Sequence, residues 1–109
     1  MQYADDVAKL FIRATEVEFE GAEVFNLESN IVTMQDIVDT IEKLLPESRG
    51  QITFDDQALP FPIGFDGSML RQSLQAPAPL SLEAGIAQSI DFFRDAVAAG
   101  KLSLKDIEA

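Results

Sequence analysis

The chain has 109 residues, with 8 Lys and Arg against 19 Asp and Glu, so its formal net charge is −11 at pH 7. This length allows one small domain, residues 1–109, and the negative charge disfavours nucleic acid and anionic membranes as partners. The absence of Cys and His excludes disulfides, thiolate nucleophiles, imidazole bases and the usual zinc ligands.

The N-terminal segment predicts an amphipathic helix over residues 6–15. Asp5 or Asp6 is expected to cap it, because a short carboxylate accepts hydrogen bonds from the free N–H groups of a first turn. The apolar positions at helical spacing are Val7, Leu10, Phe11 and Ala14. After Gly21, the pattern of residues 22–27 predicts a short strand.

The second predicted helix has the clearest start. Thr33 is its expected N-cap, and Asp36 three residues later completes a capping box. Pro46 should end the helix, because proline cannot continue the hydrogen-bond ladder. The side chains expected on the buried face are Ile37, Val38, Ile41, Leu44 and Leu45. Residues 51–54 predict a second short strand.

Residues 59–66 form an apolar segment that cannot be a regular helix or a central strand. Pro60, Pro62 and Gly64 interrupt it. An apolar loop has to pack against something, so Phe61 and Phe65 are expected either on the body of this domain or in a pocket or interface with a neighbouring domain.

Two further helices are predicted after this loop. Asp66 is the expected cap of a short helix carrying Met69, Leu70 and Leu74. Ser81 is the expected cap of a longer one, which Gly100 should end. The apolar stripe of the longer helix consists of Leu82, Ile86, Ile90, Phe93 and Val97.

Motifs for catalysis are missing from this sequence. The six glycines are scattered, so neither a dinucleotide-binding fingerprint nor a P-loop is present. Serines have no histidine to serve as a general base. The acidic residues lack calcium-loop spacing and are expected to cap helices and turns. We therefore assign no catalytic, cofactor-binding or metal-binding residue to this chain.

One short motif allows a different hypothesis. The segment around Ser68 (Phe65-Asp66-Gly67-Ser68-Met69-Leu70) resembles the modified-serine segment of acyl and peptidyl carrier proteins. Ser68 would then carry a phosphopantetheine arm. Pro77 and Pro79 would truncate the helix that should follow, and the predicted strands do not suit a four-helix carrier, so this remains a minor alternative.

Taken in order, five segments resemble the C-terminal third of extended short-chain dehydrogenases/reductases, the family of NAD-dependent sugar-nucleotide epimerases and dehydratases. Tyr3-Ala4-Asp5-Asp6-Val7-Ala8 is similar to the family segment that opens a helix. Glu23-Val24-Phe25-Asn26-Leu27 resembles its following strand, and Thr33 to Leu44 its next helix. Asp66-Gly67-Ser68-Met69-Leu70 resembles an Asp-x-Ser-Lys-Leu turn. The last likeness covers residues 80–86 and 90–94.

This resemblance implies an α/β fold, with about four helices around short, parallel strands. In the family, the Gly-rich NAD loop and the Tyr-x-x-x-Lys catalytic pair lie upstream, and neither is present here. The resemblance therefore implies a substrate-side fragment that is inactive alone, binds no cofactor itself and lacks the cofactor-binding domain. The parent enzyme would use NAD(P) and act on a sugar nucleotide or a related small molecule.

The substrate contacts expected from this resemblance are Tyr3, Phe61, Phe65 and Arg71. Many family members place an Arg before the Asp-x-Ser turn, where it meets a diphosphate. The stretch directly before Asp66, residues 59–65, contains no Arg, so a smaller or less charged substrate is compatible, with Arg71 as a substitute.

The second main hypothesis is a stand-alone acidic interaction domain whose apolar stripes are all covered internally. A fragment should instead self-associate, as a homo-oligomer, through the strand at 24–27 and the helix at 6–15. The N-terminus lacks a basic region followed by an apolar core, so a cytoplasmic location is expected in either case.

Overall fold

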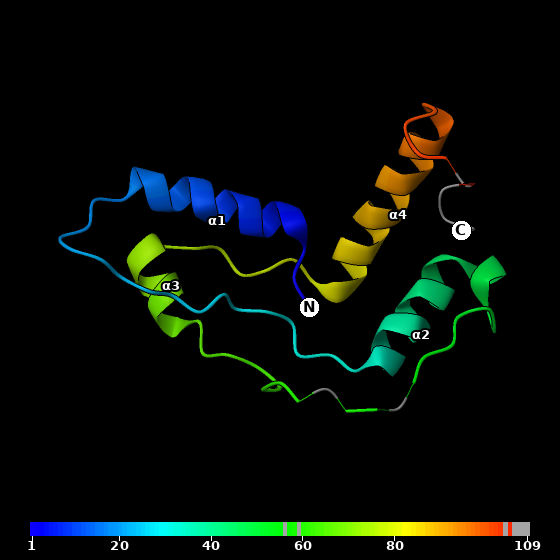
Figure 1. Cartoon of the computed structure of the whole chain (residues 1–109), viewed down its shortest axis with the longest axis horizontal. Coiled ribbons are helices and arrows are strands. Elements are labelled where there is room, and N and C mark those ends of the chain that lie inside the picture. The colour runs from blue at the N-terminus through cyan, green and yellow to red at the C-terminus, as the bar shows by residue number, and fades with distance from the viewer. Residues whose placement is uncertain (56, 59, 104, 106–109) are drawn as a thin grey trace.

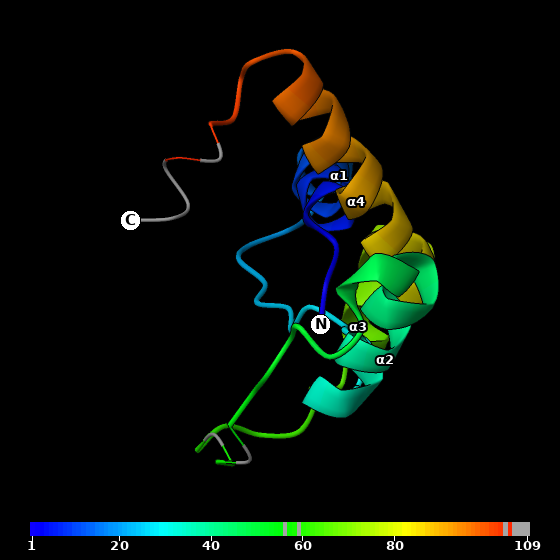
Figure 2. The same ribbon diagram turned by 90° about the vertical axis from the view of Figure 1, so that its right-hand side faces the viewer.

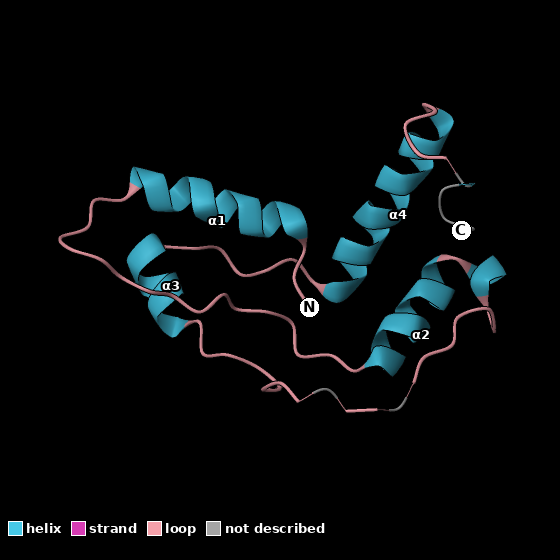
Figure 3. Ribbon diagram, viewed as in Figure 1, coloured by secondary structure: helices cyan, strands magenta, loops and turns pink. Residues whose placement is uncertain are grey.

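The computed structural model describes residues 1–55, 57–58, 60–103 and 105. This part of the chain is helical and loop-like, without a strand (Figures 1 and 3). The helices are α1 (Ala4–Glu16), α2 (Met34–Leu44), η1 (Pro46–Ser48, a short 3-10 helix), α3 (Ser68–Leu74) and α4 (Leu82–Ala98).

The helices pack as two separate pairs. At one end of the molecule α1 lies beside α3, and at the other end α2 lies beside α4 (Figure 1). Two long loops connect elements of different pairs: residues 17–33, and the described residues between 49 and 67 (49–55, 57–58 and 60–67). Figure 2 shows both loops on one side of the helical layer. The fold is therefore a single layer of helices with loops over one face.

The predicted α/β fold is wrong, because the described residues contain no sheet. Residues 22–27 have no strand partner, and the Val24 side chain is 90% exposed. Residues 51–54 likewise lack ladder hydrogen bonds and follow a turn at Gly50, where φ is 72°. A strand is stable only when a neighbour completes its backbone hydrogen bonds, and no described segment pairs with either one as a strand.

The predicted starts of α2 and α4 are confirmed. Thr33 and Asp36 form the capping box, with the Thr33 Oγ1 accepting from the Asp36 N–H at 3.1 Å. The Oγ of Ser81 accepts from the Ala84 N–H at 3.2 Å. At the ends, α2 stops two residues before Pro46, and Gly100 follows α4 with a positive φ of 66°. Local chemistry sets both helices.

The caps predicted for α1 and α3 are wrong. Asp5 and Asp6 lie inside the first turn of α1, and Tyr3 is the N-cap, without a side-chain hydrogen bond. Gly67 is the N-cap of α3. Asp66 lies one residue earlier, where its Oδ1 accepts from the Ser68 N–H at 2.9 Å. Its carboxylate still satisfies a free donor of the first turn, so the chemistry is as predicted but the position differs.

Removing a cap tests the contribution of local signals to stability. We expect Thr33→Ala to lower the free energy of unfolding by about 1 kcal/mol, because the Asp36 N–H loses its acceptor. Thr33→Ser keeps the hydroxyl and should stay close to the unmodified chain. Urea denaturation followed by circular dichroism at the helix band checks this, and equal losses for both variants would contradict it.

The buried core is small. Among the residues that the structure describes, four hydrophobic side chains are buried: Val38, Leu70, Leu74 and Ile86. Most other side chains predicted to be buried are half-buried. Some are largely exposed, with Phe11 at 69% and Phe93 at 54%. The predicted stripe of α4 therefore has its N-terminal half packed on α2 and its C-terminal half uncovered.

The molecule is also extended for its length. Its radius of gyration is 17.2 Å, against about 13 Å for a compact domain of this size. Its accessible surface is 8604 Å², against roughly 6,000 Å² for a folded monomer of this mass. The chain thus presents far more surface than a self-contained domain.

None of the helices in the described residues has both the length and the apolar character needed to cross a membrane.

Candidate functional site

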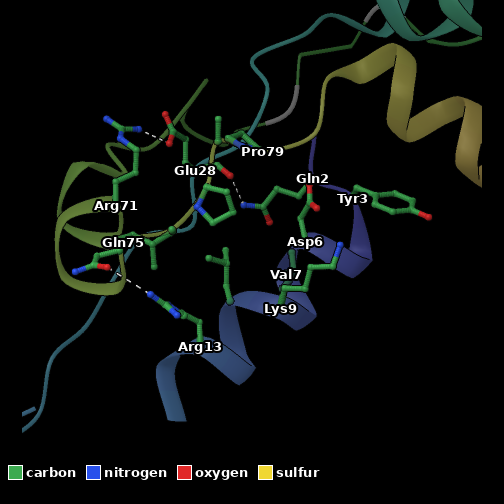
Figure 4. A pocket seen from close by; sticks show the side chains of 15 residues that line it. Gln2, Tyr3, Asp6, Val7, Lys9, Arg13, Glu28, Arg71, Gln75 and Pro79 are labelled. Atoms are coloured by element: carbon green, nitrogen blue, oxygen red, sulfur yellow. Dashed lines mark hydrogen bonds and ion pairs between the residues drawn. The ribbon is translucent and has the colours of Figure 1, made fainter. Parts of the chain in front are cut away.

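A groove of about 380 Å³ lies between α1, α3 and the chain that leads into α4 (Figure 4). Val7 and Leu10 of α1 line it on one side, and Leu70 of α3 on the other. Residues 76–79, Ala-Pro-Ala-Pro, form a third wall. We call this cavity the α1–α3 groove. Its walls are apolar, and charged side chains stand around them.

The C-terminus of α3 forms one end of the α1–α3 groove. Gln75 ends this helix in the left-handed region, with φ 50°, which leaves carbonyl groups of the last turn without helical partners. The Nε of Arg13 donates to the Leu74 carbonyl oxygen at 3.0 Å, and its Nη2 lies 3.5 Å from Gln75 Oε1. A cation at a helix C-terminus is favourable, so Arg13 fastens α1 to α3.

An ion pair closes another side of the groove. The guanidinium of Arg71 binds the carboxylate of Glu28, and both side chains are partly exposed. The hydrogen bond with Glu28, together with its negative charge, raises the pKa of Arg71 above its ordinary value. Arg71 is thereby committed to Glu28, and an anionic ligand would have to replace this carboxylate.

A polar junction joins the two helix pairs. Asp6 Oδ2 accepts from the Leu80 N–H at 2.8 Å, and Asn30 Nδ2 donates to the Leu80 carbonyl oxygen at 2.7 Å. The Asn30 N–H in turn donates to the Met1 carbonyl oxygen at 3.0 Å. We call Asp6, Asn30 and Leu80 the Leu80 junction. It holds three distant segments together without a sheet.

The predicted substrate contacts fall into separate places. Tyr3 and Arg71 both line the α1–α3 groove, although Figure 4 shows the Tyr3 ring pointing away from it. Phe61 is 72% exposed and lies outside the groove. Phe65 is 57% exposed and borders a different hollow with Phe25. The structure brings together two of the four residues and leaves the aromatic loop pair apart. Leu59, where this loop was predicted to start, lies outside the described residues.

Several groove residues were not identified from the sequence. Arg13 and Glu28 had no local motif, since their partners lie 61 and 43 residues away along the chain. Pro77 and Pro79 were noticed only as helix breakers, although they build a wall. A pattern of residues at short spacing contains no information on such contacts.

The groove shows no arrangement typical of catalysis. Its acidic groups are occupied by structural partners, with Asp6 bound to Leu80 and Glu28 to Arg71. Within the described ranges, no group of three or more Asp or Glu side chains could hold a metal ion. Ser68, the candidate for modification, is half-buried at the start of α3. What the groove offers is apolar binding surface with ionic groups at the rim.

The carboxylates at the starts of α2 and α3 predict that the protein becomes less stable in acid. The Thr33 backbone N–H and hydroxyl donate to Asp36 and lower its pKa below the ordinary 3.8. Hydrogen bonds from Ser68 lower the pKa of Asp66 in the same way. A carboxyl group whose pKa is lower in the folded than in the unfolded chain stabilises the fold at pH values above its unfolded-state pKa. This stabilisation is lost as the pH falls through the folded-state pKa.

We therefore expect the urea midpoint to fall as the pH drops below about 4. Asp36→Asn should start from a lower midpoint at neutral pH and lose less on acidification, because it has no proton to take up. Midpoints of both proteins measured between neutral and acidic pH check this. An identical decline in the two proteins would exclude Asp36 as a source of the acid sensitivity.

Comparisons of the chain with protein families, with curated proteins and with solved structures found no match. The functional assignment therefore depends on the ordered segments of the sequence and on the surface that the fold presents.

Proposed function

We propose that this chain is the C-terminal, substrate-side portion of an NAD(P)-dependent sugar-nucleotide epimerase or dehydratase, and that it is not catalytic alone. The observation that carries the proposal is the excess of exposed surface. With 8604 Å² accessible, roughly 2,600 Å² more than a compact monomer of this mass is open to solvent. Obligate interfaces bury areas of this order.

Contacts between the resembling segments support the same proposal. Tyr3, from the first segment, lies against Gly85 of the last, where an added Cβ would be 3.7 Å from Tyr3 Cβ. Asp6 binds the Leu80 N–H at the start of the last segment. The first and the last of the resembling segments are thus adjacent in space, as parts of one structural unit would be.

The exposed apolar side chains favour this proposal over a stand-alone interaction domain. That alternative requires each apolar stripe to be covered internally. Phe11 and Ile12 of α1 are 69% and 60% exposed, and Ile63 in the long loop is 87% exposed. A chain that leaves such side chains in water gains by packing against another protein surface.

The chemistry would come from the rest of the parent enzyme. NAD(P) and the catalytic Tyr and Lys would belong to that part, and the assembled enzyme would act in the cytoplasm. This chain would contribute Tyr3 and Arg71 beside the α1–α3 groove, and Phe61 and Phe65 would meet substrate at separate places outside it. Because Arg71 is paired with Glu28, a weakly charged substrate is easier to accept than a diphosphate.

The first test is the coding sequence upstream of Met1. The proposal expects an open frame that continues through a Tyr-x-x-x-Lys pair and a Gly-rich loop. An in-frame stop codon directly before Met1 would contradict it. Calorimetry gives a second test, because the isolated chain should release no heat with NAD(H), whereas tight binding would place the cofactor site here.

The carrier-protein alternative has its own test. The chain would be incubated with coenzyme A and a phosphopantetheinyl transferase, and its mass measured. A phosphopantetheine adduct that Ser68→Ala abolishes would establish the carrier function and displace our proposal. An unchanged mass, with a genuine carrier protein modified in parallel, is the expected result.

A further inference from the structure

The α1–α3 groove differs in charge from the chain as a whole. Three of the chain's 8 Lys and Arg residues line it: Lys9, Arg13 and Arg71. Among the residues that the structure describes, two of the chain's 19 Asp and Glu residues do so, Asp6 and Glu28. The lining side chains therefore carry a net charge of +1, in a chain whose formal net charge is −11. Because opposite charges attract, the groove favours a negatively charged ligand over a cation.

Most of the polar side chains in the groove already bind partners within the chain. Gln2 Nε2, for example, donates to the Glu28 carbonyl oxygen at 2.7 Å. The side chains engaged in this way are Gln2, Asp6, Arg13, Glu28, Arg71 and Gln75. A ligand could use these groups only by breaking contacts that hold α1 and α3 in place, which would cost more than a single new hydrogen bond returns.

Lys9 is the cation of the groove that stays available. None of the ion pairs among the described residues involves it. It lies four residues before Arg13 on α1, so both side chains start from the same side of the helix. Figure 4 shows them extending from the α1 wall in different directions, with Arg13 towards Gln75 and Lys9 away from it. One ammonium group is therefore free to bind the charged end of a ligand.

The walls beside Lys9 suit an apolar body. Val7 and Leu10 line one wall, and residues 76–79 line another. Pro77 and Pro79 of this second wall have no N–H and cannot donate a hydrogen bond. The groove volume of about 380 Å³ lies within the range of small-molecule sites, roughly 300–1,000 Å³. A hydrocarbon chain would gain by leaving water here, whereas the hydroxyl groups of a sugar would lose hydrogen bonds to water without replacement.

We propose that the α1–α3 groove binds a small carboxylic acid with an apolar body, with its carboxylate at Lys9 and its hydrocarbon part between α1 and residues 76–79. A single negative charge fits, because a second one would lie near the carboxylates of Asp6 and Glu28, which also line the groove. A sugar nucleotide, with two phosphates and many hydroxyl groups, matches neither the charge nor the walls. The acid is therefore a second ligand, and this inference goes beyond the proposed function and does not depend on it.

Titrations of the isotope-labelled full chain, followed by NMR, test the charge preference. Octanoate, octan-1-ol and octylamine share one hydrocarbon chain and differ in their charged group. We expect octanoate to bind with a dissociation constant of about 1 mM or lower and to shift the amide signals of Leu10 and Leu70. Octan-1-ol should bind about three- to tenfold more weakly, and octylamine more weakly still. Octan-1-ol binding as tightly as octanoate would overturn the proposal, since the ammonium of Lys9 would then contribute nothing.

Removing the ammonium of Lys9 tests its role directly. Lys9→Gln should weaken octanoate binding about three- to tenfold and leave octan-1-ol binding unchanged. Lys101→Gln is the matched control, because Lys101 is exposed beyond the end of α4, lies outside the groove and changes the net charge by the same amount. Since Lys9 is also exposed, both variants should keep the circular dichroism of the unmodified chain. Equal weakening by the two substitutions would indicate a general effect of net charge and overturn the proposal.

Filling the groove tests the location of the apolar body. Val7→Phe should weaken the binding of octanoate and octan-1-ol alike by more than about tenfold, and Ala78→Trp, at an exposed position of the opposite wall, gives a second obstruction that leaves α1 unchanged. Undiminished binding by both variants would overturn the proposal, as would octanoate shifts concentrated at the exposed Phe92 and Phe93 of α4. None of these results bears on the upstream coding sequence, so the ligand site and the enzyme family can fail separately.

Discussion

Replacing Gly67 with alanine is expected to lower the free energy of unfolding by about 1–3 kcal/mol. Gly67 precedes α3 and lies directly against Glu28. A Cβ added there would be 2.6 Å from Glu28 Cβ, 3.2 Å from its Cα and 3.3 Å from its backbone N. These atoms belong to the backbone and its first carbon, so they cannot rotate away. The start of α3 would have to shift, and the Arg71–Glu28 ion pair with it.

Gly85 provides a matched control within α4. A Cβ at Gly85 would meet Tyr3 at 3.7–3.9 Å, which is ordinary van der Waals contact. Since alanine favours a helix interior by about 1 kcal/mol over glycine, Gly85→Ala should be neutral or stabilising. Urea denaturation of both variants decides the matter. If Gly67→Ala were as stable as Gly85→Ala, α3 would not approach Glu28 as the structure shows.

The features predicted correctly from the sequence are those that depend on neighbours along the chain. The Thr33–Asp36 capping box, the Ser81 cap and the helix-ending Pro46 each act within a few residues. Their hydrogen bonds form wherever the segment is placed. The helices at 34–44 and 82–98 could therefore be predicted almost to the residue, whatever packs around them.

The prediction of strands was wrong because strands depend on residues far away along the chain. Residues 22–27 have the side chains of a strand, but a strand needs a neighbour to complete its hydrogen bonds. Val24 is 90% exposed, so here this neighbour is missing. The predicted burial of the apolar stripes of α1 and α4 was wrong in part for a similar reason. Periodicity identifies an apolar face, but it does not show whether another surface covers that face. Phe11 and Phe93 are the examples.

The candidate site was only partly predictable. Arg71 was named as a substrate contact, but its attachment to Glu28 depends on residues 43 apart along the chain. The same is true of Arg13 at the end of α3. Contacts of this kind follow from the tertiary arrangement. They change the interpretation of Arg71, because a guanidinium paired with a carboxylate competes poorly for an external anion.

The Leu80 junction should be the most sensitive polar site of the molecule. Asp6 and Asn30 bind the N–H and the carbonyl oxygen of Leu80, and both hydrogen bonds are partly buried. Each side chain lies far from Leu80 in sequence, by 74 and 50 residues. Because the core has so few buried side chains, these bonds provide much of what joins the α1–α3 pair to the α2–α4 pair.

We expect Asp6→Ala to lower the free energy of unfolding by about 1.5–3 kcal/mol, because the bond it removes is charge-assisted. Asn30→Ala should cost about 1 kcal/mol, and Asp6→Asn less than Asp6→Ala, since an amide oxygen can still accept from Leu80. The double alanine variant should lose less than the sum of the two single losses, because both side chains hold the same residue. Urea denaturation of the four variants measures these terms. Strict additivity would mean that the two bonds act independently and that the junction is not a cooperative unit.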